Sequence, residues 1–146
     1  MRLWHYKLID VLPRQQLLGQ WREINLIWKE IQTDGMIHHI IVDYINNESL
    51  YEFVSYATMV YEEMLKRKYK VNENLMYEIS KGFNKSIINK HICMGPYKNY
   101  HDNRYLRQCY YNLQEKFDRG GIDLDEWWIL QNKVYSLIQV DIEGTL

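Results

Sequence analysis

Hydrophobic residues near the start of the chain recur every three or four positions, which is the spacing of one face of an α-helix. This stripe consists of Leu17, Trp21, Ile24, Trp28 and Ile31. Pro13 suits the first turn of such a helix, and Asp34-Gly35 suits its end. The pattern predicts a long amphipathic helix over residues 13–34.

Similar stripes predict more helices downstream. Ser49 and Glu52 have the spacing of a capping box, which starts a helix that continues to about Tyr69. Other helices are expected over residues 72–81, 102–119 and 123–138, the last with Asp123 and Glu126 again spaced as a cap.

Two segments give weaker signals. The β-branched run in residues 36–45 leaves a short helix and an extended segment equally open, and residues 85–100, which hold Gly95-Pro96, are expected to form an irregular loop with room for one helical turn. The prediction is an all-α domain of about five helices over residues 1–146.

The composition fits one ordinary domain. A chain of 146 residues buries roughly two-thirds of the surface that its unfolded form exposes, so stability requires no disulfide or metal. Cys93 and Cys109 lack CxxC spacing and are expected to be reduced, buried thiols. No apolar run has the length of a secretory signal or a membrane span, so we expect a cytoplasmic protein without membrane contact.

The charge is nearly balanced but uneven. A net charge of -1 argues against indiscriminate binding to phosphate backbones, because counterion release requires clustered Lys and Arg. Residues 81–119, however, contain eight Lys and Arg against three Asp and Glu. A basic surface can therefore exist on a protein that is neutral overall.

The beginning of the chain carries the most specific pattern. Met1-Arg2 is followed in the first helix by Gln15, Leu17, Arg22 and Glu23. These residues resemble the pyrimidine-dimer DNA glycosylase (endonuclease V-like) family, with Trp21 where the phage member of the family has a tyrosine. Weaker similarities follow over residues 60–69, at 113–116 and at the aromatic pair Trp127-Trp128.

The resemblance implies a DNA-repair glycosylase with abasic-site lyase activity on damaged double-stranded DNA, acting through a Schiff base without a cofactor. A free α-amine suits that reaction, since its reference pKa of about 8 leaves a useful neutral fraction at physiological pH. The family pattern assigns the amine to Met1, because the large Arg2 should obstruct removal of the initiator methionine, and the carboxylate to Glu23. It assigns DNA contacts to Arg2, Gln15 and Arg22.

The sequence also departs from the family. Leu26 stands where the phage member has an arginine one turn beyond its glutamate, and Gln16 stands at a histidine position. The alternative is therefore a helical nucleic-acid-binding or protein-binding relative that has lost the reaction. The lesion recognised and the oligomeric state are not indicated by any motif.

Several other groups have a structural explanation beside a functional one. Arg22 and Glu23 can be ordinary solvated helix charges, and the cluster at residues 66–68 can either complement a helix dipole or contact phosphates. Trp127 and Trp128 cannot both face the core of one helix. The candidate zinc ligands, which have no standard motif spacing and predict no metal site, are His38, His39, His91, Cys93, His101 and Cys109.

Overall fold

The computed structural model describes residues 1–139, and within that range every regular element is a helix. The elements in order are η1 (Tyr6–Val11), α1 (Arg14–Asp34), η2 (Ile40–Asn47), α2 (Leu50–Lys66), α3 (Glu73–Ser80), α4 (Lys85–Met94), α5 (Asn103–Asp118) and α6 (Leu124–Leu137), where η denotes a 3₁₀-helix. The all-α prediction is confirmed, but the expected five helices were too few. None of the described helices is both long and apolar enough to cross a membrane.

Helix α1 has the predicted bounds but buries a slightly different face. It ends at Gly35, which adopts a left-handed conformation with φ of 76° and donates its N–H to the Ile31 carbonyl at 2.9 Å. Its buried residues are Leu17, Gln20, Trp21, Ile24 and Ile27. The predicted Trp28 and Ile31 are only partly buried, and their place in the core is taken by Ile27 and by the polar Gln20.

The two weakly predicted segments are both partly helical. Of the two alternatives for residues 36–45, the short helix is correct for the second half, because Ile40–Asn47 forms the 3₁₀-helix η2. The expected loop over residues 85–100 is wrong, because ten of its residues form α4. Asn84 caps this helix by accepting hydrogen bonds from the Ser86 and Ile87 amides at 2.9 and 3.3 Å, and Gly95-Pro96 lies after its end.

Of the two expected capping boxes, the one at Ser49 is half formed and the one at Asp123 is not formed. The Ser49 hydroxyl accepts from the Tyr51 amide as expected, but Glu52 accepts from the Tyr97 amide at 2.6 Å instead of returning to the cap. Likewise, Glu126 accepts from the Arg14 amide at 2.5 Å, and Asp123 makes no side-chain cap. Both carboxylates connect distant segments, which local spacing could not show.

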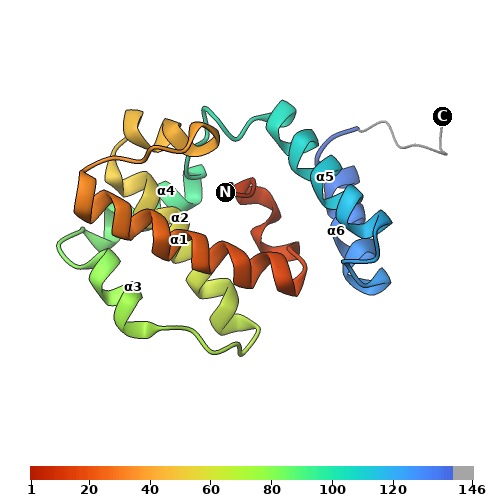
Figure 1. Ribbon diagram of the computed structural model, residues 1–146, viewed down its shortest axis with the longest axis horizontal. Helices are drawn as coiled ribbons and strands as arrows, with labels where there is room; N and C mark the ends of the chain where they lie inside the picture. Colours follow the sequence, from red (N-terminus) through yellow and green to blue (C-terminus); the bar gives the residue numbers. More distant parts are fainter. Residues whose placement is uncertain (140–146) are drawn as a thin grey trace.

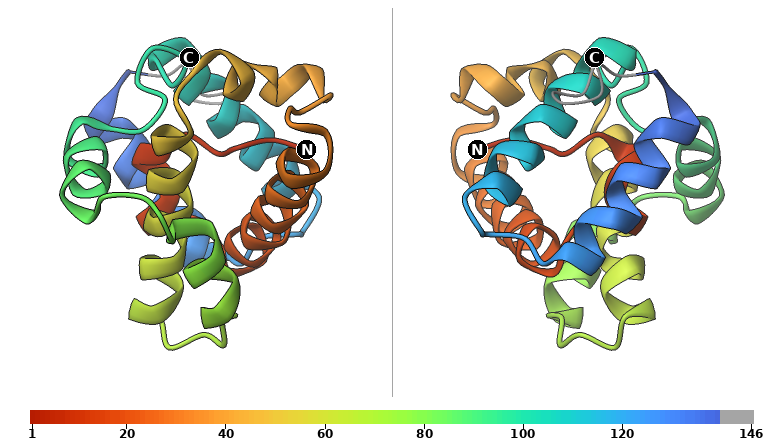
Figure 2. Two further views of the ribbon diagram at one scale, coloured as in Figure 1. Left: turned by 90° about the vertical axis from the view of Figure 1, so that its left-hand side faces the viewer. Right: turned by 90° about the vertical axis from the view of Figure 1, so that its right-hand side faces the viewer.

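The helices form two groups with the amino-terminal segment between them. Helices α1 to α4 make up the larger group, in which α2 contacts α1, α3 and α4, and α5 and α6 pack together as a pair (Figure 1). η1 contacts both α2 and α6, so the start of the chain joins the two groups. The side views show the amino-terminal segment crossing between them (Figure 2).

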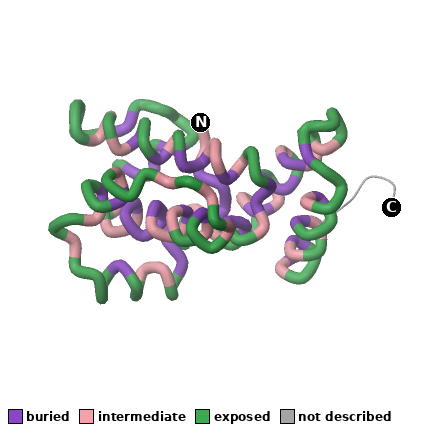
Figure 3. Tube along the Cα trace, turned by 90° about the horizontal axis from the view of Figure 1, so that it is seen from below, coloured by how far each residue is buried: buried purple, intermediate pink, exposed green. Residues whose placement is uncertain are grey.

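One continuous hydrophobic core includes residues from every element, and the buried positions follow the inner faces of the helices (Figure 3). In the α5–α6 pair, Trp127 is buried and stacks on Phe117 with ring centroids 4.8 Å apart, whereas Trp128 is 54% exposed. This confirms the expectation that the two tryptophans cannot share the core.

Arg67 holds η1 against α2. Its guanidinium pairs with Glu63 at 2.7 Å and donates to the carbonyl of Leu12 at 2.8 Å and to that of Asp10 at 3.2 Å. These carbonyls belong to the end of a helix, which a cation stabilises. The guanidinium therefore has a structural role in fixing η1, and the exposed cations of the 66–68 cluster are Lys66 and Lys68.

The position of Gly95 leaves no room for a side chain. Its φ is 93°, and a Cβ atom built there would lie 2.6 Å from the Tyr6 hydroxyl oxygen, with other atoms of the ring equally close. The ring of Tyr6 thus packs directly on the glycine backbone. This contact fixes the end of the amino-terminal segment against the turn that follows α4.

We expect Gly95→Ala to lower the free energy of unfolding by about 2–4 kcal/mol, because it combines backbone strain with displacement of Tyr6. Urea denaturation followed by circular dichroism measures this. Gly35→Ala is the matched control: Gly35 also has a positive φ, but no atom lies within 4 Å of the position that an added methyl group would take. Equal losses in the two variants would contradict the role of the Tyr6 contact.

Candidate functional site

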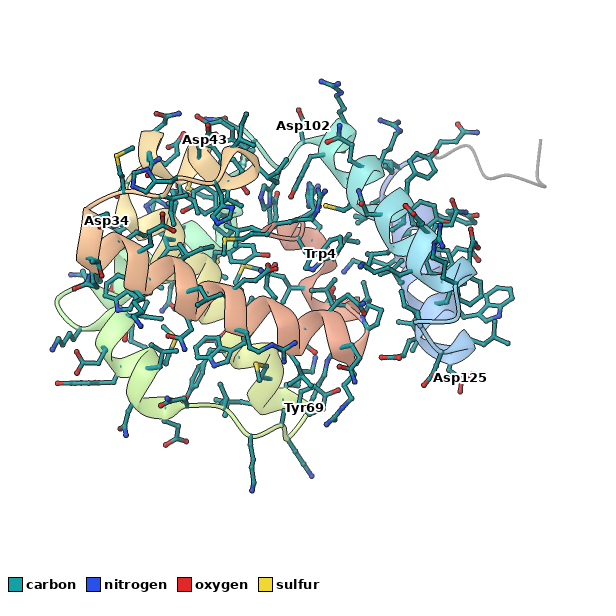
Figure 4. The ribbon with its side chains drawn as sticks, in the orientation of Figure 1. Trp4, Asp34, Asp43, Tyr69, Asp102 and Asp125 are labelled. Carbon is teal, nitrogen blue, oxygen red and sulfur yellow. The ribbon has the colours of Figure 1, made fainter. Side chains whose placement is uncertain are left out.

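The first five residues form an extended segment that has no sheet partner and is buried from Leu3 onward. Leu3, Trp4 and His5 are all buried, and Trp4 lies in the middle of the molecule (Figure 4). An extended backbone usually satisfies its N–H and C=O groups in a sheet, and unpaired groups are costly to bury. Here side chains from α1, α2, α5 and the turn before α5 take over that role.

Gln20 of α1 makes four hydrogen bonds at this segment. Its Oε1 accepts from the Trp4 amide at 2.7 Å and from the Tyr56 hydroxyl at 2.8 Å. Its Nε2 donates to the Arg2 carbonyl at 3.0 Å and to Glu23 Oε2 at 3.2 Å. These four bonds use the two donors and two acceptor positions of an amide side chain.

Two tyrosines hold the carbonyls of the segment. Tyr56 of α2, which is fully buried, lies 2.6 Å from the Trp4 carbonyl and 2.8 Å from Gln20 Oε1, and its hydroxyl shares one proton between them. Tyr105 of α5 donates to the Leu3 carbonyl at 2.6 Å. Burial raises the pKa of both phenols above the ordinary value, so both are neutral donors at physiological pH.

The predicted carboxylate lies beside the start of this segment. The Arg2 amide donates to Glu23 Oε2 at 3.4 Å, and Glu23 is partly buried at the rim of the core. The Met1 nitrogen is the preceding backbone nitrogen, so standard backbone geometry puts it within about 7 Å of the same oxygen. The fold therefore brings Met1, Arg2 and Glu23 into one site although 21 residues separate Arg2 from Glu23.

Of the three residues predicted to contact DNA, Arg2 and Arg22 lie next to this site and Gln15 lies farther away. The Arg2 guanidinium lies over the rings of Trp4 and Tyr105, 5.6 and 5.8 Å from their centroids. Arg22 is exposed on α1, with its guanidinium folded back toward Gly19. Gln15 is also exposed but lies eight residues before Glu23, about 12 Å away along the helix, so it is outside the immediate site.

A buried histidine cluster supports the other end of the segment. The Nδ1 atom of His101 accepts from the Tyr6 amide at 3.1 Å, so the ring proton lies on Nε2, which is 2.9 Å from the Tyr44 hydroxyl. His5 Nδ1 accepts from the Lys7 amide at 3.1 Å. Burial lowers the pKa of His5 to about 4 and that of His101 well below the ordinary value, which keeps both rings neutral.

The sequence pattern does not identify the residues that organise the site. Gln20 lies on the flank of the α1 stripe, Tyr56 falls outside the apolar stripe of its helix, and His101 stands out only as a candidate zinc ligand. One signal is available for Gln20, which lies three residues before Glu23 and four after Gln16, on the same side of the helix. The partners of Tyr56, Tyr105 and His101 in the amino-terminal segment are 52 to 102 residues away and give no local signal.

Two of the candidate zinc ligands make hydrogen bonds to other side chains. His91 pairs with Glu52 at 2.9 Å, and His101 belongs to the cluster described above. Within residues 1–139 one group of side chains has the spacing to hold a metal, formed by Glu30, Asp34 and His38 at the exposed end of α1. It lies on the surface far along α1 from Glu23 and contributes nothing to this site.

The geometry defines a class of helical protein in which an amino-terminal segment is fixed beside a glutamate of the first long helix. A family model described as pyrimidine dimer DNA glycosylase matches residues 1–77, just over half of the chain, and the chain belongs to this family. The matched region contains Met1, Gln20, Glu23 and Tyr56. Searches of curated proteins and of solved structures found no match. Family membership assigns the protein a DNA-repair role of the glycosylase type.

We expect stability to fall as the pH drops from 6.5 toward 4. Both histidines have depressed pKa values in the folded state, so the unfolded chain binds more protons over this range, and each histidine lowers the unfolding free energy by about 1 kcal/mol per pH unit. Urea denaturation at pH 7.5, 6 and 5 measures the slope. Besides Tyr44, the rings of Tyr56, Tyr97 and Tyr105 face His101 and do not titrate in this range.

A His101→Gln variant isolates one contribution. Glutamine can still accept from the Tyr6 amide but does not titrate, so the variant should be less stable at pH 7.5 and lose less stability on acidification. His39→Gln, at an exposed position, is the control and should keep the slope of the unmodified protein. An unchanged slope in His101→Gln would rule out the buried ring as its source.

Proposed function

We propose that this protein is a DNA glycosylase with abasic-site lyase activity, acting on pyrimidine dimers or other damaged bases through a Schiff base to the amine of Met1. The single observation that carries the proposal is the contact between the Arg2 amide and the partly buried Glu23 carboxylate, because Arg2 follows the residue whose amine is the proposed nucleophile. Membership in the glycosylase family supports the same reaction.

In the proposed reaction the neutral amine attacks C1′ of the damaged nucleotide, and the glycosidic bond breaks with its electron pair leaving on the base. The deoxyribose ring then opens as the bond from C1′ to the ring oxygen breaks, which leaves an imine between Met1 and the sugar. Loss of a proton from C2′ expels the 3′ phosphate and cuts the strand. Glu23 stabilises the positive charge at C1′ and transfers the protons.

Phosphate binding falls to the cations around this pair. Arg22 is exposed one residue from Glu23, and Arg2 adjoins the amine. Stacking on Trp4 and Tyr105 limits the directions in which the Arg2 guanidinium can point, so it suits a fixed phosphate position. Extruding a nucleotide costs a few kcal/mol, and less where a lesion has already weakened stacking, so damage itself contributes to selectivity.

Borohydride trapping on a duplex with one abasic site tests the nucleophile and the carboxylate. We expect a covalent adduct that maps to Met1 by peptide mass spectrometry, no adduct after acetylation of the amino terminus, and a rate about 100-fold lower in Glu23→Gln, since acid–base catalysis typically contributes at least that factor. Glu62→Gln, at an exposed position of α2, is the control.

The possible failures have separate meanings. An adduct on a lysine would show that Met1 is not the nucleophile, and undiminished trapping in Glu23→Gln would remove the proposed role of that carboxylate. If the unmodified protein binds damaged duplex but gives no adduct, the protein is a non-catalytic member of the family.

Arg22→Gln tests the phosphate contact. Removal of one such contact should weaken binding to all duplexes similarly and reduce the slope of log affinity against log salt by about 1. Fluorescence anisotropy over a salt series measures both. The control is Arg119→Gln, an exposed arginine about 20 Å along α5 from Tyr105, which should leave the slope unchanged. An equal reduction in both variants would indicate a general charge effect.

A further inference from the structure

We propose that Gln20, supported by Tyr56, is the positioning residue that orients both the amino terminus and the Glu23 carboxylate for the reaction. This inference rests on the proposed function and deepens it. It is based on an arrangement in which one buried side chain contacts the carboxylate and the backbone that carries the amine.

The position of the amine depends on two bonds of Gln20. Nε2 holds the Arg2 carbonyl, and Oε1 holds the Trp4 amide, so the segment is fixed on both sides of Leu3. Only the backbones of Met1 and Arg2 lie between the amine and the Arg2 carbonyl, and the Arg2 amide between them is bonded to Glu23. A shift of Gln20 is therefore transmitted to the amine with little freedom to absorb it.

The orientation of Glu23 depends on the same side chain. Its Oε2 receives both the Gln20 amide and the Arg2 amide, whereas Oε1 accepts no hydrogen bond from residues 1–139. Two donors on one oxygen fix the plane of the carboxylate and leave the other oxygen available. We assign the contact with the substrate sugar to Glu23 Oε1.

The requirement is specific for glutamine. A buried group at this position must donate twice and accept twice, which an amide does and which a carboxylate, a thioether or an imidazole does not. Asparagine has the same groups but is shorter by one methylene, so it cannot reach all four partners. Gln20 is 1% exposed, which excludes water as a ready substitute.

Tyr56 fixes Gln20 in turn. Its hydroxyl shares one proton between Gln20 Oε1 and the Trp4 carbonyl, so it joins the amide to the segment from the side of α2. Rotation of the Gln20 amide by 180° would set its NH₂ group against the Trp4 amide, which can only donate, and its oxygen against the Arg2 carbonyl, which can only accept. The backbone of residues 2–4 therefore determines which end of the amide faces Glu23, and Tyr56 adds a second contact that holds Oε1 in place.

The test measures single-turnover trapping on the abasic duplex beside the affinity for the same duplex. We expect the rate to fall about 100-fold in Gln20→Met and about 10-fold in Tyr56→Phe, since a displacement near 1 Å can cost two orders of magnitude, while affinity changes less than about threefold. Tyr110→Phe is the matched control, because Tyr110 is also fully buried but bonds to Gln131 in the α5–α6 pair.

Gln20→Glu tests the donor role separately. The charged form keeps both acceptor contacts but loses both donors, and a protonated carboxyl regains one. The ratio of unmodified to variant rate should therefore shrink as the pH is lowered from 8 to 5. A purely structural role of Gln20 would not produce this dependence in samples shown by circular dichroism to remain folded.

Hydrogen exchange of the Trp4 amide reports on the segment without requiring catalysis. Faster exchange together with an unchanged trapping rate in Gln20→Met or Tyr56→Phe would overturn the inference and leave the proposed function intact. Absence of an adduct in the unmodified protein would refute both.

If Gln20→Met does not fold, Tyr56→Phe decides, because it keeps the ring and removes one oxygen. A slower rate with unchanged affinity, and a Tyr110→Phe variant equal to the unmodified protein, would support the assignment.

Discussion

Burial of an extended backbone without a neighbouring strand is the constraint on which this structure depends. Each unsatisfied N–H or C=O in residues 2–6 would cost about 1–3 kcal/mol, a large fraction of the stability of a small domain. Gln20, Tyr56, Tyr105 and His101 remove that cost with neutral side chains from separate elements. The helices are thus held in a mutual arrangement that the segment itself defines, since η1 contacts both helix groups.

The same hydrogen bonds that stabilise the segment also define the proposed site. The bonds that satisfy the buried backbone of residues 2–6 therefore also fix the backbone that carries the proposed amine near Glu23. Met1 and Arg2 remain partly exposed at the end of the buried run, while Leu3 is fully buried. A terminus of this kind combines access for a substrate with the rigidity of the core immediately behind it.

The sequence is sufficient for features with local causes. The periodicity of Leu17, Trp21 and Ile24 predicts α1. Because Trp127 and Trp128 cannot both face the core of one helix, the sequence also predicts that one of them is exposed, and the structure shows that it is Trp128. Helix geometry alone places Glu23 at the border of the core. α4 escapes prediction because Gly95-Pro96 is a stronger local signal than the Asn84 cap.

The organisation of the site could not be predicted in this way. A glutamine on an amphipathic helix is normally assigned to the solvated face, and only a partner brought in by the fold makes its burial favourable. Glu52 and Glu126 also show that local spacing does not predict tertiary partners. Both fit a local capping pattern, yet they accept hydrogen bonds from backbone amides 45 and 112 residues away. Local spacing identifies the type of residue required, whereas tertiary contacts select its partner.

The links of η1 and the first residues to α5 and α6 also determine when the site can exist. Tyr105 is 102 residues from Leu3, and Lys133, which pairs with Asp10 at 2.8 Å, is 123 residues away. Contacts of such long sequence separation form late in folding because loop closure must precede them. On the ribosome, residues 1–11 would therefore wait for α5 and α6, and the proposed reactive amine would acquire its fixed surroundings only once these two helices are in place.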